Sequence, residues 1–137
     1  MKKLLVFIAV FLFANPNFYV KDFNKAHVVN AGGGFKVYEL INSKNDPVNP
    51  GFSIALAKLK PNSVTKPHYL NSSNQVAYIL KGNGVLYINN KPVKVKEKMS
   101  IYIAPKVEMY VKSGDKGLEF LVIVSPAWRS QDEIIKN

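Results

Sequence analysis

Residues 61–82 read PNSVTKPHYLNSSNQVAYILKG, and the second half of this stretch has the pattern of a β-strand. The run 75–81 is rich in β-branched and aromatic residues and lies between a Ser/Asn cluster and a glycine. Side chains alternate across a strand, so if Gln75 faces inward, the residues on the other face point outward. That outer row is apolar and requires cover by N-terminal residues or by another subunit; it consists of Val76, Tyr78 and Leu80.

The same strand signal recurs along the chain between Gly, Pro and Asn residues. After residue 20 no stretch has a sustained apolar period of 3.6, so we expect an all-β sandwich or closed barrel. Asn89-Asn90 predicts a two-residue hairpin turn, because Asn tolerates a positive φ. The predicted strands are Phe35–Ile41, Phe52–Lys60, Gln75–Lys81, Val85–Ile88, Ser100–Ile103, Glu108–Lys112 and Leu118–Val124.

The C-terminal end departs from the strand pattern. Ser130 and Glu133 have the spacing of a capping box, and two acidic residues fall in the first turn, where the helix dipole favours them. A short helix is therefore predicted from about Gln131 to Lys136. Trp128 and Arg129 precede it and are expected to dock this tail onto the barrel.

Residues 98–113, KMSIYIAPKVEMYVKS, form a second stretch with informative spacing. Together with residues 61–82 it resembles the two signature motifs of the cupin superfamily, G-x5-H-x-H-x3,4-E-x6-G and G-x5-P-x-G-x2-H-x3-N. Fifteen residues separate Gly82 from Lys98, the usual short distance between these motifs. The motif positions fall on Asn62, His68, Leu70, Gln75 and Gly82, then on Lys98, Ala104, Lys106, Met109 and Ser113. The resemblance implies a small antiparallel β-barrel of the jelly-roll type.

Metal-dependent cupins hold one divalent ion with the two histidines and the glutamate of the first motif and the histidine of the second. Only His68 keeps its identity here, since Leu70 cannot ligate and Gln75 is a weak neutral donor. An ordinary divalent ion, and with it a conventional dioxygenase or oxalate-type activity, is therefore not expected. Because a thioether suits Cu(I), a site of His68, Gln75 and Met109 stays open, although Met109 more simply fills core space.

The resemblance instead implies an apolar cavity that keeps two polar groups. Such a lining suits a small organic, sugar- or acid-like ligand. We expect four residues to contact it: His68, Leu70, Gln75 and Met109. The expected lining further includes Ala77, Ile79 and Val111.

Composition limits the remaining possibilities. The chain of 137 residues has no cysteine and two histidines, which excludes disulfides, Cys-ligated zinc and a three-His metal site within one chain. A net charge of +10 would attract anionic partners, but the lysines are scattered and there is one arginine, so no nucleic-acid partner is expected. Lys94, Lys96 and Lys98 alternate with apolar residues and read as a solvated strand face.

Residues 1–14 have the organisation of a secretory signal peptide, because Lys2 and Lys3 precede an unbroken apolar run from Leu4 to Ala14. This run is too short to span a bilayer, which needs about 20 residues. An uncleaved membrane anchor remains an alternative. We therefore expect a periplasmic or secreted protein whose single cupin domain occupies residues 26–137, with a net charge lowered from +10 to +8 if the two lysines are removed.

Three functions remain open on the sequence. The first is a homodimeric small-molecule-binding protein. The second is an isomerase, lyase or dioxygenase-type enzyme that uses His68 with a tyrosine, or with an atypical metal set. The third is an envelope assembly factor whose partner surface is the apolar outer row around Tyr78. Glu108 and Glu119 are the carboxylates expected nearest the barrel, but no spacing pairs them for acid–base catalysis.

Overall fold

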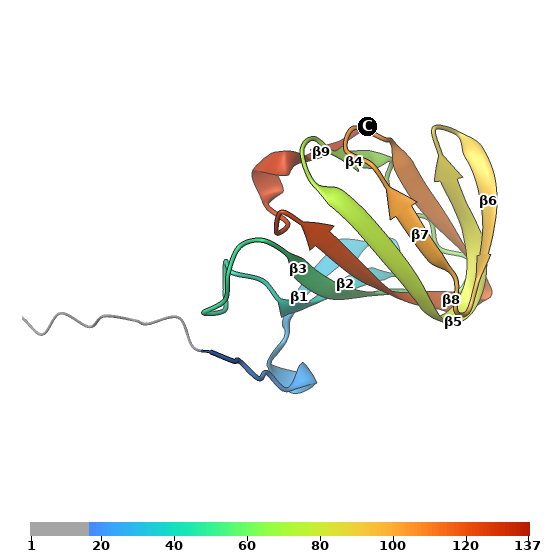
Figure 1. Ribbon diagram of the computed structural model, residues 1–137. Coiled ribbons are helices and arrows are strands. Elements are labelled where there is room, and N and C mark those ends of the chain that lie inside the picture. Colours follow the sequence, from blue (N-terminus) through green and yellow to red (C-terminus); the bar gives the residue numbers. More distant parts are fainter. Residues whose placement is uncertain (1–16) are drawn as a thin grey trace, which may run out of the picture.

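The computed structural model describes residues 17–137, and β-strands dominate it (Figure 1). Two 3-10 turns, η1 and η2, lie near the chain ends. The elements are η1 (Phe23–Lys25), β1 (His27–Gly32), β2 (Phe35–Ile41), β3 (Ser53–Leu59), β4 (His68–Leu70), β5 (Asn74–Ile88), β6 (Lys91–Lys96), β7 (Ser100–Ile103), β8 (Met109–Ser125), η2 (Ser130–Asp132) and β9 (Glu133–Ile135).

The strands form one antiparallel sheet that curls into two facing layers. Residues 74–82 of β5 pair with residues 118–125 of β8 in the first layer, which β3, β2 and β1 extend on one side and β7 on the other. Residues 84–88 of β5 pair with residues 109–113 of β8 in the second layer, between β6 and β4. The predicted all-β jelly-roll barrel is confirmed.

β5 and β8 are each continuous, whereas the sequence predicts two strands in each place. The predicted breaks are bends: the β5–β8 register shifts between Gly82 and Gly84. Gly82 has a φ of +81°, and a Cβ there would collide with the carbonyl oxygen of Gly117 on the facing strand. Glycine at this position therefore allows one strand to pass from the first layer to the second.

Three motif positions that hold glycine in the family hold other residues here but keep a backbone conformation that favours glycine. Asn62, Lys98 and Lys106 have φ angles of 55°, 68° and 67°, in the left-handed region that side chains other than Asn rarely adopt. The predicted hairpin turn at Asn89-Asn90 is confirmed, since both residues have positive φ between β5 and β6. The backbone conformation therefore supports the alignment with the cupin motifs at positions where the residue type differs.

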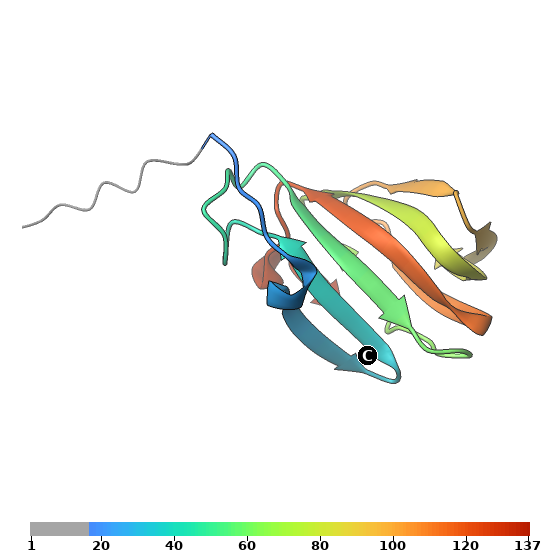
Figure 2. The same ribbon diagram turned by 90° about the horizontal axis from the view of Figure 1, so that it is seen from below.

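The N-terminal segment covers part of the outer face of the first layer, as Figure 2 shows for η1 and β2. The ring of Phe23 lies 5.0 Å from that of Tyr38, and the Lys21 ammonium lies 2.7 Å from the buried Asp46 carboxylate. Burial disfavours the charged form of Asp46, but hydrogen bonds from Lys21 and the Asn42 N–H outweigh it and lower the pKa of the carboxyl.

The predicted signal peptide, residues 1–14, lies outside the described residues. From residue 17 onward the structure contains no helix long and apolar enough to cross a membrane.

The C-terminal helix predicted over residues 131–136 is not formed. A single 3-10 turn, η2, is followed by β9, which pairs with β4. The capping-box hydroxyl of Ser130 makes no cap, whereas the Asp132 carboxylate accepts hydrogen bonds from the backbone N–H groups of Ser72 and Ser73. This contact docks the turn on the β4–β5 loop, and the β-branched Ile134 and Ile135 then continue as a strand.

Candidate functional site

The predicted site residues converge at the end of the barrel opposite the bend at Gly82. Met109 is the register partner of both His68 on β4 and Ile88 at the end of β5. The Gln75 amide, at the start of β5, lies 3.8 Å from the Met109 sulfur. We call this region the barrel mouth and define it by His68, Gln75, Met109, Trp128 and Glu133.

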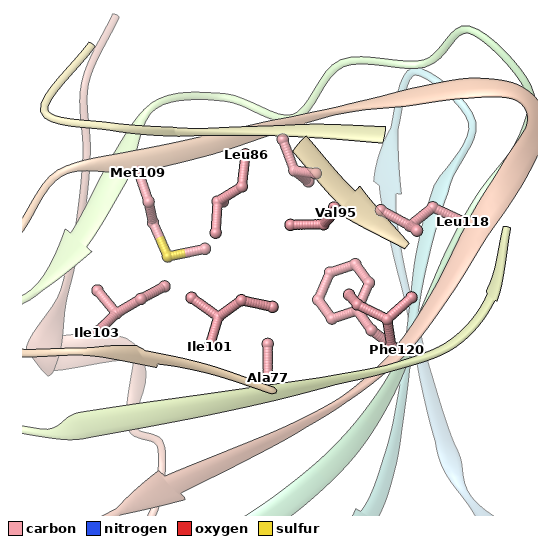
Figure 3. Close-up of a pocket in the computed structure, with 10 residues that line it drawn as sticks. Ala77, Leu86, Val95, Ile101, Ile103, Met109, Leu118 and Phe120 are labelled. Atoms are coloured by element: carbon pink, nitrogen blue, oxygen red, sulfur yellow. The ribbon is translucent and has the colours of Figure 1, made fainter. Parts of the chain in front are cut away.

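The barrel interior is packed core, which differs from the predicted ligand cavity. A void of about 20 Å³ remains, room for about one water molecule, and only apolar side chains line it (Figure 3). Of the predicted lining, Ala77, Ile79, Met109 and Val111 surround this void, whereas His68, Leu70 and Gln75 do not. A ligand of sugar size therefore has no room inside the barrel as it stands.

His68 is held in a defined orientation at this mouth. Its Nδ1 lies 2.9 Å from the Lys66 carbonyl oxygen, which can only accept, so Nδ1 carries a proton. In the neutral ring Nε2 is then an acceptor, and it lies 3.9 Å from Oε1 of Glu133. Two facing acceptors at this separation can both be satisfied by a ligand that offers two donor protons, such as a pair of neighbouring hydroxyl groups.

Glu133 reaches the mouth because β9 pairs with β4. In this pairing Glu133 lies opposite Leu70, which is two residues after His68 on β4. The indole N–H of Trp128 donates to Oε2 of Glu133 over 3.2 Å, which leaves Oε1 directed at the imidazole. The side chains of His68 and Glu133 are 18% and 25% exposed, so solvent reaches both. The sequence analysis missed Glu133 because its spacing from Ser130 fits a capping box.

A second missed carboxylate, Glu39, is buried close to this cluster. It accepts hydrogen bonds from Lys44 Nζ at 3.1 Å and Asn45 Nδ2 at 2.7 Å. Lys44 also lies over the Trp128 ring, 5.0 Å from its centroid, so Glu39, Lys44, Trp128, Glu133 and His68 form one chain of contacts. The sequence contained a signal for a buried Glu39. The alternation in residues 35–41 places this carboxylate on the same strand face as the apolar Val37 and Ile41.

The two carboxylates expected nearest the barrel are engaged in ion pairs. Glu108 pairs with Lys136, and Glu119 pairs with Lys58, its register partner on β3. Neither carboxylate pairs with His68. Trp128 does dock the tail, through its indole and through a backbone N–H that donates to Ser53.

Asp132 fixes the tail that carries Glu133. Its buried carboxylate accepts from the N–H groups of Ser72 and Ser73 at 2.9 and 3.1 Å and from the Ser72 hydroxyl. Burial disfavours the charged form, but these hydrogen bonds are stronger and lower the pKa of Asp132. A charged Asp132 therefore stabilises the position of β9 and of Glu133.

The donors at the mouth do not fit a divalent metal ion. From residue 17 to the C-terminus no three His, Asp or Glu side chains gather as ligands. Leu70 is buried and apolar where the family has a histidine, and the Gln75 amide is engaged with the Met109 thioether. One imidazole with one thioether is a donor set for Cu(I) rather than for iron, manganese or nickel. The absence of a resident metal stays a prediction.

Comparison with known proteins identifies relatives of this architecture. The family model described as "Cupin domain" matches residues 55–124. An uncharacterized protein of Methanocaldococcus jannaschii is 31% identical over 81 residues, which cover 58% of this chain and 65% of that protein. The match thus leaves about a third of the relative's length uncovered.

Solved structures with the same fold have diverse activities. A Streptomyces nucleoside dehydratase, Pac13, superposes with a TM-score of 0.75 at 18% identity, covering 88% of this chain and 92% of that one. Oxalate decarboxylase from Bacillus subtilis gives 0.73 at 16% identity, covering 88% of this chain and 34% of that one. The polyketide cyclase RemF from Streptomyces resistomycificus gives 0.65 at 19% identity, covering 84% and 89%. At these identities the likeness concerns the fold.

Proposed function

This chain belongs to the cupin domain family, and we propose that it binds a small organic, sugar- or acid-like ligand at the barrel mouth. The observation that carries the proposal is the pair of acceptors, His68 Nε2 and Glu133 Oε1, 3.9 Å apart and partly exposed. The two hydroxyl groups of a vicinal diol, as a sugar-like ligand carries them, would donate one hydrogen bond to each of these acceptors.

The surroundings of this pair support an organic ligand. The Gln75 amide contacts the Met109 thioether, and Leu70 and Met109 place apolar side chains next to His68. A few convergent polar groups on an apolar wall are typical of small-molecule sites. Because the interior beyond is filled, the ligand lies at the surface of the mouth and is small.

A thermal-shift screen of carbohydrates and aromatic acids tests this proposal. A ligand that binds the folded protein raises its Tm by mass action, so we expect at least one compound to stabilise the wild type but not His68→Ala. His27→Ala is the matched control, because His27 lies on the exposed strand β1. No stabilisation by any compound, or equal stabilisation of wild type and His68→Ala, contradicts the proposal.

A second candidate function is metal-free acid–base catalysis by His68. It is favoured by the Lys66 carbonyl, which orients the ring and leaves Nε2 as the acceptor, and by the adjacent Glu133 carboxylate. A base near a second proton-transfer group is what an elimination or isomerisation requires, and Pac13 is a dehydratase on the same fold. In this role His68 would take a proton and Glu133 would stabilise the imidazolium.

Metal analysis of the purified protein separates this candidate from metal-dependent catalysis. We expect less than stoichiometric copper, iron, manganese and nickel. Any activity found with a ligand from the screen is then expected to survive chelation and to be lost in His68→Ala. Stoichiometric metal that disappears in His68→Ala contradicts the metal-free proposal.

We further propose an exported homodimer. The outer row of β5 supports the dimer. Val76, Tyr78 and Leu80 in this row are 36%, 36% and 40% exposed. Tyr102 on β7, which is 62% exposed, extends the row. Within residues 17–137, Phe23 packs on Tyr38 of β2 while this row stays exposed, and a second copy would bury it.

A further inference from the structure

A surface hollow of about 580 Å³ lies beside the bend of the barrel. This volume is within the range of small-molecule sites, about 300–1,000 Å³. None of the residues that line it belongs to the barrel mouth. They come from the β5–β6 hairpin, the segment before β7 and the bend of β8, and include Val85, Lys94, Lys96, Met99 and Asp115.

The hollow carries two lysines without partners. Neither Lys94 nor Lys96 forms an ion pair with any residue from 17 to 137. They are two positions apart on β6, so their side chains leave the same face of that strand, about 6–7 Å apart along it. Lys112 on β8 joins this face, since Val85 is the register partner of both Lys94 and Lys112.

Opposite charge on this surface is sparse. Asp115 is the acidic residue in the lining, against two lysines there and a third on the adjacent strand. Glu97 follows Lys96 but accepts a hydrogen bond from the Gly82 N–H. Unpaired ammonium groups at the edge of a hollow form a favourable environment for an anion.

The floor of the hollow is apolar. Met99 is 37% exposed, and Val85 lies between the two lysine-bearing strands. We propose that this hollow is a second ligand site, distinct from the barrel mouth, for a small organic anion. Its carboxylate or phosphate group contacts Lys94 and Lys96, and its apolar part lies on Val85 and Met99.

Amide chemical-shift mapping with phenyl phosphate, inorganic phosphate and benzyl alcohol tests this site. We expect phenyl phosphate to give saturable shifts confined to residues 83–85, 94–99 and 112–115. Inorganic phosphate lacks the apolar part and benzyl alcohol lacks the anionic group, so each is expected to bind at least about tenfold more weakly. Equal binding of phenyl phosphate and inorganic phosphate, or shifts spread over lysines throughout the chain, would overturn the proposal.

Charge variants complete the test. The double variant Lys94→Gln/Lys96→Gln is expected to weaken phenyl phosphate binding about tenfold or more. Lys91→Gln removes one positive charge, against two in the double variant, from the same strand but lies outside the lining, so it is expected to bind as the wild type does. Equal loss in both variants would assign the effect to net charge and contradict a defined site. His68→Ala leaves this binding unchanged, so failure here and failure at the barrel mouth are distinguishable.

Discussion

His68 and Glu133 face each other across paired strands at the end of a filled barrel, with Nε2 of one 3.9 Å from Oε1 of the other. Each is fixed by a separate contact: the imidazole by the Lys66 carbonyl and the carboxylate by the Trp128 indole.

The imidazole orientation predicts one tautomer of His68. In the neutral ring the proton is expected on Nδ1, because the Lys66 carbonyl accepts a hydrogen bond from it. Long-range proton–nitrogen NMR correlation distinguishes the two tautomers, and the exposed His27 provides an internal comparison. A proton on Nε2 of His68 would contradict the proposed acceptor role of that atom.

The Asp132 contacts predict a pH-dependent loss of stability. The pKa of Asp132 is lowered from the usual 3.8, so its stabilisation is complete above that value and is lost as the pH falls through the lower folded-state pKa. Asp132→Asn is expected to cost about 1–3 kcal/mol at neutral pH, with a smaller difference from wild type at strongly acidic pH. Urea unfolding across this pH range measures the effect.

Asp115→Asn is the control for Asp132, because Asp115 is exposed. It is expected to change the free energy of unfolding by less than about 0.5 kcal/mol. A cost for Asp132→Asn that stays constant down to strongly acidic pH would contradict the role assigned to the charged carboxylate.

The left-handed backbone at the motif positions predicts stabilising substitutions. Lys98→Gly and Lys106→Gly relieve a Cβ clash at φ angles of 68° and 67°, and each is expected to gain about 0.5–1 kcal/mol. Lys36→Gly, in the middle of β2, is expected instead to cost about 1 kcal/mol. Thermal unfolding compares the three variants, and a loss of Tm in all of them would contradict the assigned conformations.

The outer row of β5 predicts the oligomeric state. Tyr78→Lys places a charge in the middle of the exposed apolar row and is expected to convert a dimeric wild type into a monomer. Val64→Lys is the control, because Val64 is 50% exposed but lies outside this row. Light scattering after size-exclusion chromatography gives the mass of each. A monomeric wild type would show that this surface is not an interface between copies.

Local pattern and spacing predicted the fold well. The predicted bounds of residues 35–41 and 100–103 agree with β2 and β7, because in both cases a compact apolar run lies between turn residues. The strand ends predicted around Gly82 were wrong, because glycine bends the strand there without ending it. Whether the ladder continues depends on the partner strand, here β8, which is far away in the sequence.

The site was predicted in part. Motif spacing brought together His68, Gln75 and Met109, because the cupin pattern encodes which strand positions meet. It did not provide Glu133, since local capping preference and long-range pairing with β4 compete for the same residues, and pairing prevails once Asp132 is bound by Ser72 and Ser73. The sequence did not predict the filled interior either. How closely the apolar side chains fill the barrel depends on how they pack in three dimensions, which residue types alone do not reveal.

Calorimetric titration of the strongest compound from the screen into wild type, His68→Ala, Glu133→Gln and His27→Ala tests ligand binding at the barrel mouth most directly. We predict a Kd raised about tenfold or more by each substitution at the mouth, because a hydrogen-bonded polar partner is lost, and an unchanged Kd for His27→Ala. The same Kd in all four proteins would show that the ligand binds elsewhere and that the mouth is not its site.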